Sequence, residues 1–434
     1  MARELIFGTP GFAGAFAQLL DDKRETAADV NAIVAAIIED VRVRGDAALV
    51  EYTNRFDRTS IDAGALPIGR DEVDAAIADC SGDTVAALEQ AAWRIEEFHR
   101  CQKPESLSYT DPAGVSLGYR WTPLGAAGLY VPGGTASYPS SVLMNAIPAK
   151  VAGVERLVMV VPTPDGKLNP LVLAAARIAG IDEIYRVGGA QAVAALAFGT
   201  ATIRPVDKIV GPGNAFVAAA KRQVFGTVGI DMIAGPSEIL VVADRFNDPS
   251  WIAADLLSQA EHDTAAQSIL ITDDAAFGRE VMKAVDGHLT TLPRAAIAGE
   301  SWEAHGAVIV VPQIDAAVEL IDRIAPEHLE LAVDQPEILS QKVRNAGAIF
   351  LGRYTPEAVG DYVGGPNHVL PTARSARFSS GLGVLDFMKR TTLLGCDSAS
   401  LRQIGPIAVT LARAEGLGAH ALSVALRLNL PRTP

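Results

Sequence analysis

Two neighbouring side chains, Glu327 and His328, have types suited to moving protons. A histidine titrates near neutral pH, and a carboxylate can orient or deprotonate a water molecule, so the two groups suit different proton-transfer tasks. They lie in Ala325–Glu330, directly after Pro326. On adjacency alone an exposed polar turn is the more frequent outcome for such a segment, so a catalytic and a structural interpretation both stay open.

A second group of side chains has the types that bind divalent metals. Gln259 and His262 end a helical stretch that begins near Trp251, and their i, i+3 spacing places them on one helix face. The signal is weak, because a glutamine oxygen is an unusual zinc ligand. Asp361 and His368 lie in a loop dense in glycine, and long glycine-rich loops after α/β strands often carry function.

One further pair of an acid and a histidine lies near the end of the sequence. Glu415 and His420 are five residues apart on a predicted C-terminal helix, which makes them neighbours around the helix without stacking them. A solvated helix face is the simpler explanation of this pair, and the spacing alone assigns no role to either residue.

Three glycine-rich loops follow predicted strands, namely Pro132–Gly134, Gly188–Gln191 and Gly211–Asn214. None is a complete G-x-G-x-x-G, and Phe216 stands where the third loop needs its last glycine. A single loop of this kind is mostly a turn, but three at the ends of strands in one sheet favour a nucleotide or phosphate site. The side chains placed to touch such a ligand are Tyr130, Gln191 and Asn214.

A repeated alternation of strand, loop and helix carries these candidate residues. From about residue 125, short apolar runs end in glycine or proline and lead into helical stretches. Such alternation predicts parallel sheets covered by helices on both faces. The pattern restarts after residue 237, which favours two α/β units over one large sheet. The predicted strands are Leu129–Val131, Leu157–Val161, Ile184–Val187, Ile209–Val210, Ile239–Ala243, Ser268–Thr272, Ala307–Val311 and Ala348–Leu351.

Both ends of the chain are predicted to be helical. Helices are predicted in the first hundred residues because apolar residues recur there at helix spacing in two stripes. One stripe runs from Val30 to Val41 and the other from Val85 to Phe98. From about residue 383 the sequence predicts loops and one long helix, from Arg402 to about Leu428. The predicted divisions are an N-terminal helical region (1–124), part of which packs on the second α/β domain, two α/β domains (125–236 and 237–382) and a C-terminal tail (383–434).

Composition and charge exclude several classes of protein. The 434 residues are 49% apolar and 20% charged, which excludes a mostly disordered chain. The net charge of −14 argues against nucleic acid as the main partner. The longest uncharged stretch, Trp121–Ala149, contains prolines and glycines and cannot be one lipid-facing helix. Three widely spaced cysteines favour the reducing cytoplasm over a disulfide framework.

Taken together, these segments resemble the histidinol dehydrogenase family. The run Ile230–Glu238, continuing to Ser258–His262, resembles the signature of that family. The resemblance covers nearly the whole chain, and it is weakest in the first hundred residues and between about residues 275 and 320. The supporting stretches are Gly128–Ala149, Gly188–Gln191, Lys208–Gln223, Ala325–Leu331 and Gly360–Thr372.

The resemblance implies a fold, a reaction and cofactors. Members of this family have two incomplete Rossmann-like domains, and they oxidise L-histidinol to L-histidine through L-histidinaldehyde with two NAD and one zinc ion per active site. By resemblance, residues 125–236 form the NAD side, residues 237–382 carry the zinc and catalytic residues, and Glu327 and His328 transfer protons. No cysteine lies in a matched motif, so a covalent thiol mechanism has no candidate nucleophile.

The resemblance also assigns the remaining site residues. The zinc ligands would be Gln259, His262, Asp361 and His420. The family takes the last of these from the other subunit of a domain-swapped homodimer, so the tail would contribute to the partner's active site. The substrate contacts would be Ser237, Gln259, His262, His328, Asp361, Glu415 and His420. The cofactor contacts would be Tyr130, Gln191 and Asn214.

Two other functions stay open on the sequence. One keeps the scaffold and oxidises another small alcohol to its acid with NAD. The other is hydrolysis of an amide or ester by a zinc-bound water, against which the three glycine-rich loops argue. We therefore expect a cytoplasmic homodimeric enzyme with shared active sites, acting on a small molecule, with neither nucleic acid nor a membrane as its partner.

Overall fold

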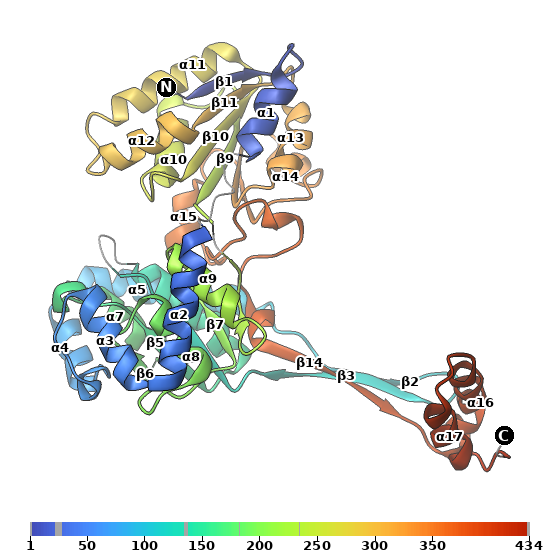
Figure 1. The fold of residues 1–434 in the computed structure, drawn as a ribbon. Helices are drawn as coiled ribbons and strands as arrows, with labels where there is room; N and C mark the ends of the chain where they lie inside the picture. The colour runs from blue at the N-terminus through green and yellow to red at the C-terminus, as the bar shows by residue number, and fades with distance from the viewer. Residues whose placement is uncertain (1, 22–27, 134–137, 182, 234, 432–434) are drawn as a thin grey trace. The chain divides into compact units, whose positions relative to one another are not determined.

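The computed structural model describes residues 2–21, 28–133, 138–181, 183–233 and 235–431 (Figure 1). The chain forms two compact units. The first comprises Met1–Gln102 and Gly125–Phe387, and the second comprises Lys103–Leu124 and Met388–Pro434. In the described ranges, no helix is both long and apolar enough to cross a membrane.

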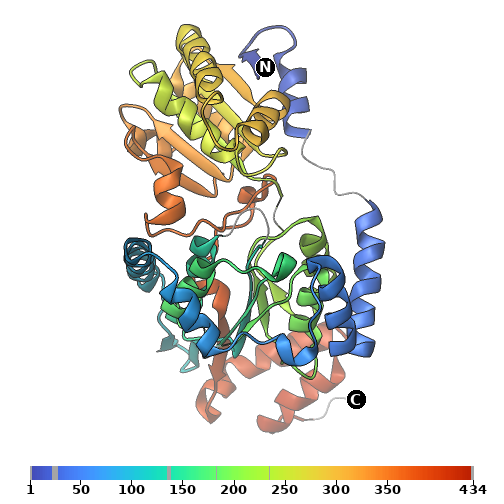
Figure 2. The same ribbon diagram turned by 90° about the vertical axis from the view of Figure 1, so that its left-hand side faces the viewer.

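The first unit contains a parallel sheet with the strand order β6-β5-β4-β7-β8. The four strands predicted between residues 125 and 236 are confirmed as β4 to β7, and the short β8 was not predicted. Helices cover both faces of this sheet (Figure 2). The strands are β4 (Ala126–Tyr130), β5 (Arg156–Val160), β6 (Glu183–Tyr185), β7 (Lys208–Val210) and β8 (Gly229–Ile230). The helices that follow β4 to β7 are α6 (Pro139–Ala152), α7 (Pro170–Ile178), α8 (Gly189–Phe198) and α9 (Ala215–Val224).

A second parallel sheet has the order β1-β11-β10-β9-β12-β13, and the four strands predicted after residue 237 are confirmed in it. Figure 1 shows helices on both of its faces. The strands are β1 (Arg3–Ile6), β9 (Glu238–Ala243), β10 (Gln267–Thr272), β11 (Ala307–Val310), β12 (His328–Ala332) and β13 (Ala348–Leu351). The helices are α1 (Phe12–Asp21), α10 (Pro249–Ala260), α11 (Ala275–His288), α12 (Ala295–His305), α13 (Ala317–Ile324), α14 (Pro336–Ser340) and α15 (Glu357–Tyr362).

Of the two interpretations of Ala325–Glu330, the exposed polar turn is wrong, because His328 opens β12 and every residue of β12 is buried. A prediction about the start of the chain is also wrong. The start of the chain is not wholly helical, because Arg3–Ile6 forms β1 and pairs with β11 in parallel. Both strands depend on partners far away in the sequence, which local patterns do not reveal.

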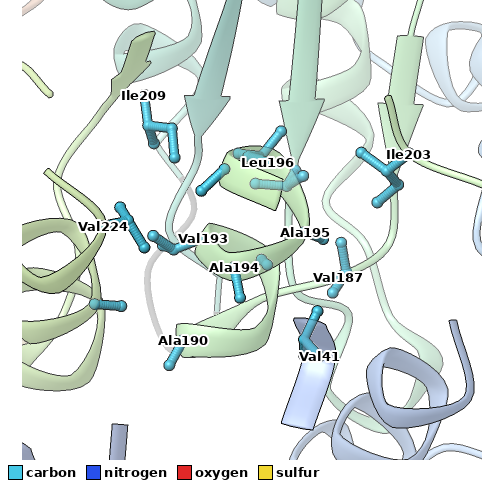
Figure 3. Packing of buried hydrophobic residues seen from close by; sticks show 14 of the residues in the cluster. Val41, Val187, Ala190, Val193, Ala194, Ala195, Leu196, Ile203, Ile209 and Val224 are labelled. Atoms are coloured by element: carbon cyan, nitrogen blue, oxygen red, sulfur yellow. The ribbon is translucent and has the colours of Figure 1, made fainter. Parts of the chain in front are cut away.

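Apolar cores lie between the sheets and their helices. On the second sheet, α10, α11 and α12 pack on one face and α1, α13 and α14 on the other. On one face of the first sheet, side chains of α8 lie in one apolar cluster with those of α2 (Ala28–Arg44), β7 and α9; Figure 3 labels Leu196 of α8 together with Val41, Ile209 and Val224 of this cluster. Truncating a fully buried leucine such as Leu196 to alanine costs about 2–5 kcal/mol.

The helices predicted in the first hundred residues are confirmed, and they pack around the first sheet. On α2 the predicted apolar stripe is buried at Val34, Ile37, Ile38 and Val41, whereas Ile33 is half exposed. The remaining helices of this region are α3 (Asp46–Asp57), α4 (Arg70–Ala78) and α5 (Gly82–Arg100). The short 3₁₀ segments of the unit are η1 (Ala63–Ala65), η2 (Pro164–Gly166), η3 (Ile314–Ala316), η4 (Ser375–Arg377) and η5 (Val384–Phe387).

The second unit joins an antiparallel sheet to a helical hairpin. The sheet order is β14-β3-β2, from β2 (Leu107–Thr110), β3 (Ser116–Pro123) and β14 (Met388–Gly395). The hairpin consists of α16 (Ser398–Ala414) and α17 (Gly418–Arg427), so the prediction of one long helix from Arg402 to Leu428 is wrong. The chain turns at Gly416, whose φ of 73° is left-handed and ends the first helix. The strand β14 was also missed.

Candidate active site

Glu327 and His328 lie at the amino-terminal edge of the second sheet, where β12 begins. Ala325 has a left-handed φ of 47° that ends α13 and turns the chain toward the strand. The register of β12 then places His328 beside Ile239 of β9 and Ala348 of β13. Both side chains of the pair are buried, so the sheet holds them away from bulk water.

The backbone of Glu238, the first residue of β9, orients both side chains. The imidazole of His328 donates its Nδ1 hydrogen to the carbonyl oxygen of Glu238 at 3.0 Å, because a carbonyl can only accept. The N–H of Glu238 donates to Oε2 of Glu327 at 2.9 Å. The Nε2 of His328 is buried and has no hydrogen-bond partner among the described residues. In the neutral ring this atom is therefore a free proton acceptor.

Two more carboxylates approach that nitrogen. Oε1 of Glu357 lies 3.7 Å and Oδ1 of Asp361 lies 3.8 Å from Nε2 of His328. Glu357 and Asp361 are four residues apart on α15, which puts them on one helix face. Ser258 donates to Oε2 of Glu357 at 3.1 Å, and the N–H of Glu357 donates to Oε1 of Glu330 at 2.5 Å. One ligand atom from each of His328, Glu357 and Asp361 lies within 4.8 Å of the other two, so this cluster could hold a cation.

The end of α10 carries Gln259, and His262 follows it and interacts electrostatically with Glu357 and His328. Asp248 caps the start of this helix by accepting from the N–H of Ser250, and the helix ends at Ala260. Gln259 is buried, and its Oε1 has no hydrogen-bond partner within the described part of the chain. His262 follows the helix end, and its backbone N–H donates to the carbonyl oxygen of Gln259 at 3.2 Å. A buried amide oxygen without a hydrogen-bond partner is suited to a cation.

Ser237 and His368 lie at the border of the site. Ser237 is half-buried and directly precedes β9, and its carbonyl oxygen accepts from the N–H of Gln267 at 2.9 Å. His368 donates from Nδ1 to the carbonyl oxygen of Asp361 at 3.0 Å. Its Nε2 lies 3.3 Å from Oγ of Ser141, in the first turn of α6.

Tyr138, which lies between β4 and α6, makes a second contact at the border of the site. The ring of Tyr138, which precedes α6, lies 6.4 Å from the ring of His262. With the contact between Ser141 and His368, this brings the start of α6, beyond the carboxyl end of β4, close to His262 and His368.

Burial and charge shift the pKa values in this cluster strongly. Burial raises the pKa of Glu327 to about 7. Burial and the neighbouring Glu357 raise the pKa of Asp361 to about 8. Burial lowers the pKa of His328, but the carboxylates of Glu327, Glu357 and Asp361 outweigh it and raise the pKa overall. So many carboxylates in a dry site need either protons or a cation to balance them.

In contrast to His328, the histidines His262 and His368 have lowered pKa values. Burial lowers the pKa of His368 to about 4 and lowers the pKa of His262. Both imidazoles are therefore neutral at pH 7, which is the form that binds a metal.

Glu415 and His420 belong to the second unit. Glu415 is the residue after α16, and His420 lies in the first turn of α17, so the two flank the break between the helices instead of sharing one helix. Both are exposed in the single chain. Their predicted roles at the active site stay predictions.

Sequence reasoning missed Glu357 and the supporting roles of Glu238 and Glu330. The spacing of Glu357 and Asp361 is a signal that could have been found, because residues four apart face the same side of a helix. The backbone contacts of Glu238 could not have been found, because they depend on the pairing of β9 with β12. The observed cluster of His328, Glu357 and Asp361 shares only Asp361 with the predicted zinc set.

The three predicted cofactor residues lie at the carboxyl edge of the first sheet. Tyr130 ends β4, is buried, and accepts a hydrogen bond at its hydroxyl from the N–H of Gly189 at 3.1 Å. Gln191 lies in the first turn of α8; its Oε1 is buried and unpartnered with respect to the described residues. Asn214 is exposed and caps α9 by accepting from the N–H groups of Phe216 and Val217, which leaves its amide nitrogen available to a ligand.

A buried ion pair fixes the third glycine-rich loop. Gly211 has a φ of 113°, and a Cβ there would overlap the carbonyl oxygen of Tyr130, so only glycine fits. Its N–H donates to Oδ2 of Asp231 at 2.7 Å, and its carbonyl oxygen accepts from Nζ of Lys221 at 2.9 Å. Asp231 and Lys221 also pair with each other, and both side chains are buried. The pair therefore sets the position of the loop that carries Asn214.

Comparison with known proteins identifies the family. The family model for histidinol dehydrogenase matches residues 20–428. The chain is 69% identical over 430 residues to a histidinol dehydrogenase from Rhodospirillum rubrum and 65% identical over 430 residues to one from Rhizobium meliloti, with 99% of each chain covered in both cases.

A solved structure agrees with this assignment. The fold matches a crystal structure of histidinol dehydrogenase from Elizabethkingia anophelis with a TM-score of 0.94 and 38% sequence identity, covering 99% of this chain and 98% of the other. The chain therefore belongs to the histidinol dehydrogenase family, a family of NAD-dependent oxidoreductases.

Proposed function

We propose that this protein oxidises L-histidinol to L-histidine through L-histidinaldehyde, with two NAD molecules and one zinc ion per active site. Family membership supports the reaction. The observation that carries the assignment of roles is the buried pair of Glu327 and His328. Glu238 orients both side chains through its backbone and leaves Nε2 of His328 free.

The two side chains perform the proton transfers. His328 accepts the hydroxyl proton of the substrate at Nε2 as hydride leaves the carbinol carbon. Bound NAD supplies the hydride acceptor in each of the two oxidations. In the second half-reaction, Glu327 removes a proton from a water molecule, which attacks the aldehyde carbon to give the hydrate that is then oxidised. Burial of both side chains excludes bulk water from the aldehyde.

We place the zinc ion on Gln259, His262 and Asp361 of one subunit and His420 of the partner subunit. The buried, unpartnered oxygen of Gln259, the half-buried imidazole of His262 with its lowered pKa, and the raised pKa of Asp361 fit a site that takes a cation. Amide and carboxylate oxygens with two imidazole nitrogens form a mixed set that zinc accepts. A zinc ion on these residues would supply the means to position the substrate through its nitrogen atoms. This placement leaves Nε2 of His328 free for proton transfer, whereas a cation on His328, Glu357 and Asp361 would occupy it.

We further propose a homodimer with shared active sites. The helical hairpin of the second unit buries few apolar side chains of its own, while its outer faces expose others to solvent. Such a surface favours cover by a second copy of the chain. In this arrangement residues 125–236 bind NAD, residues 237–382 carry zinc and the catalytic pair, and residues 383–434 complete the partner's site with Glu415 and His420. Three free cysteines fit a reducing cytoplasm.

NADH formation from L-histidinol, before and after chelation and return of zinc, tests the function. We expect activity in the purified protein, loss on chelation and recovery with zinc. If other small alcohols reduce NAD and L-histidinol does not, the related dehydrogenase is correct. Zinc-dependent hydrolysis without NAD turnover would favour the hydrolase.

A further inference from the structure

One carboxyl group lies in the apolar core between the second sheet and α10. Glu330 is 3% exposed and is the third residue of β12. The strand register places it between Val241 of β9, which belongs to the apolar cluster beneath α10, and Phe350 of β13. No proton-transfer step described above uses this side chain. A charged carboxylate is costly in such surroundings, so its partners decide whether the position is tolerated.

The partner of Glu330 is a second acid, Asp255 of α10. The two carboxyl groups are hydrogen-bonded to each other. Two carboxylates cannot form such a bond, because each is only an acceptor, so one of the two groups carries a proton. Burial raises the pKa of Asp255 to about 6, and burial together with the charge of Asp255 raises the pKa of Glu330 well above its usual range. At pH 7 the proton therefore lies mainly on Glu330, which donates it to Asp255.

The carboxyl group of Glu330 also binds the start of α15. Its Oε1 accepts from the N–H of Glu357, the first residue of that helix, at 2.5 Å. Ser258 of α10 adds a second link by donating from Oγ to Oε2 of Glu357 at 3.1 Å. Asp255, Glu330 and Glu357 thus connect α10 through β12 to α15. We call these three residues the acid bridge.

Each end of the acid bridge lies about one helical turn before a proposed zinc ligand. Gln259 follows Asp255 by four residues on α10, and Asp361 follows Glu357 by four residues on α15. Residues four apart lie on the same face of a helix. The spacing of α10 and α15 at the acid bridge therefore influences the spacing of two side chains that have to meet at one ion. Neither Asp255 nor Glu330 belongs to the proposed zinc set.

The charges around the acid bridge favour a shared proton. Glu357 acts electrostatically on both Asp255 and Glu330 and disfavours their ionisation. His328 lies on the same face of β12 as Glu330, because alternate residues of a strand point to the same side. Carboxylates already surround that imidazole, and β9 and β13 place uncharged residues beside Glu330. The proton on Glu330 thus keeps one more negative charge out of a crowded acidic region.

We propose that Asp255 and Glu330 share one proton and act as positioning residues, which hold α10 against α15 so that Gln259 and Asp361 meet at the zinc ion. The proposal deepens the proposed function and rests on it for the identity of the zinc ligands. A glutamine amide can replace the protonated carboxyl group of Glu330, because it has an acceptor oxygen and can donate to Asp255. Leucine has a similar size and can do neither. Glutamine should therefore preserve the arrangement, and leucine should not.

Zinc affinity, measured by competition with a chelator, tests this difference. In Glu330→Leu we expect zinc affinity to fall about 10–100-fold, as it does when partners of metal ligands are removed. Glu330→Gln should keep zinc affinity and kcat at neutral pH within about threefold. The KM for NAD should stay within about twofold in both variants, because the first sheet is untouched.

Ser268→Ala is the matched control for lost stability. The buried hydroxyl of Ser268 donates to the carbonyl oxygen of Leu256 on α10 at 2.7 Å, so this variant loosens α10 without altering the acid bridge. It should keep its zinc affinity. If Glu330→Leu does not fold, Asp255→Ala takes its place, because Asp255 is the half-buried end of the bridge. Asp255→Ala should then show the loss of zinc affinity expected for the leucine variant.

Unfolding of the metal-free protein by urea gives a second measurement that needs no zinc and no turnover. The pKa of Glu330 is higher in the folded protein than in the unfolded chain, so its contribution to stability is fully present below the unfolded pKa and is lost as pH rises through the folded pKa. From neutral to alkaline pH, the urea midpoint of the unsubstituted protein should therefore fall more than that of Glu330→Gln. Asp255→Asn removes the charge that helps to raise the pKa of Glu330, so its fall should lie between the two.

The outcomes separate this proposal from the proposed function. If the protein does not oxidise L-histidinol but glutamine preserves zinc affinity and flattens the pH dependence, the acid bridge stands and the proposed reaction falls. If Glu330→Gln loses as much zinc affinity as Glu330→Leu, or if its urea midpoint follows that of the unsubstituted protein at every pH, the proposal is wrong. A loss of kcat in Glu330→Gln with zinc affinity intact would also overturn it, because the proton would then have to move during turnover.

Discussion

The two parallel sheets of the first unit place their candidate residues at opposite edges. In the first sheet, Tyr130 and the glycine-rich loops follow the carboxyl ends of the strands. In the second sheet, Glu327 and His328 stand at the amino-terminal start of β12, beside Glu238 at the start of β9. Ser141 of α6, which follows β4, lies 3.3 Å from Nε2 of His368, whose Nδ1 donates to the carbonyl oxygen of Asp361.

The two edges differ in how much the sequence says about them. Ligands in open α/β sheets usually bind beyond the carboxyl ends of the strands, where loops present backbone N–H groups. That rule, applied to three glycine-rich loops, led to the prediction of a nucleotide or phosphate site at this edge. The proton-transfer pair breaks the rule, because its geometry comes from side chains at strand starts and from the backbone of a neighbouring strand. We therefore expect substitutions at the amino edge to change kcat and those at the carboxyl edge to change the KM for NAD.

The largest effect should come from Glu327→Gln at the amino edge. Losing the group that activates water should lower overall turnover by about 10²–10⁴-fold. Oxidation of the alcohol to the aldehyde should be damaged less than oxidation of the aldehyde, which single-turnover kinetics with each substrate can measure. Glu337→Gln on α14, which is exposed, is the control and should keep full activity. Equal damage to both half-reactions would contradict the assigned role.

The zinc content of variants distinguishes two possible sets of zinc ligands at the amino edge of the second sheet. One is the proposed set that includes Gln259, and the other is the cluster of His328, Glu357 and Asp361. Gln259→Ala removes a proposed ligand and should lower zinc affinity by at least about 10–100-fold, since even outer partners of ligands contribute that much. Glu357→Gln should keep zinc, because we place no metal bond on that side chain. Elemental analysis after dialysis measures both variants. If Glu357→Gln loses zinc while Gln259→Ala retains it, the ion sits on His328, Glu357 and Asp361 instead.

A substitution at the carboxyl edge should act on cofactor affinity. Lys221→Met removes the cation that holds Gly211 and leaves Asp231 buried without a partner, which should destabilise the fold by about 3–5 kcal/mol. The KM for NAD should rise about tenfold while kcat stays within about twofold, because the loop moves but the proton-transfer pair does not.

Lys208→Met is the matched control, because it breaks the ion pair of Lys208 with Asp386 at the opposite end of β7. If the first variant is too unstable to assay, the double change Lys221→Met with Asp231→Asn removes both charges and still displaces the loop. An unchanged KM for NAD in either folded variant would show that the ion pair does not position the cofactor loop.

The smallest expected effect is the activity restored in mixed dimers. It tests whether one chain alone forms the active site at the amino edge of the second sheet. Mixing subunits that carry His420→Asn with subunits that carry Glu327→Gln should restore about a quarter of full activity, because half of the dimers are mixed and each has one intact site. Each parent variant alone should be nearly inactive. No recovery, with mixed dimers demonstrated by mass spectrometry, would mean that each chain builds its own site.

Strands with apolar runs between a turn and a helix were predictable from the sequence. Those such as Leu157–Val161 and Ile239–Ala243 are buried on both faces and leave a plain pattern. β12 was missed because His328 and Glu330 interrupt its apolar run, and both are tolerated only through tertiary contacts with Glu238 and Glu357.

The pairing of strands that are far apart in the sequence could not be predicted, for a physical reason. β1 joins Ala307–Val310, and β3 joins β14 across more than half of the chain, so no local pattern reports either pairing. In the site, the types and numbers of most candidates came from the family resemblance. Glu357 joins the cluster only because α15 packs beside β12, which only the three-dimensional structure reveals.

The central claim is that the two edges form one closed site for both oxidations. Its most direct test counts NADH per L-histidinol consumed while a soluble nucleophile traps any released aldehyde. We predict two NADH for each L-histidine formed and no trapped aldehyde. One NADH per substrate with trapped L-histidinaldehyde in solution would contradict the account.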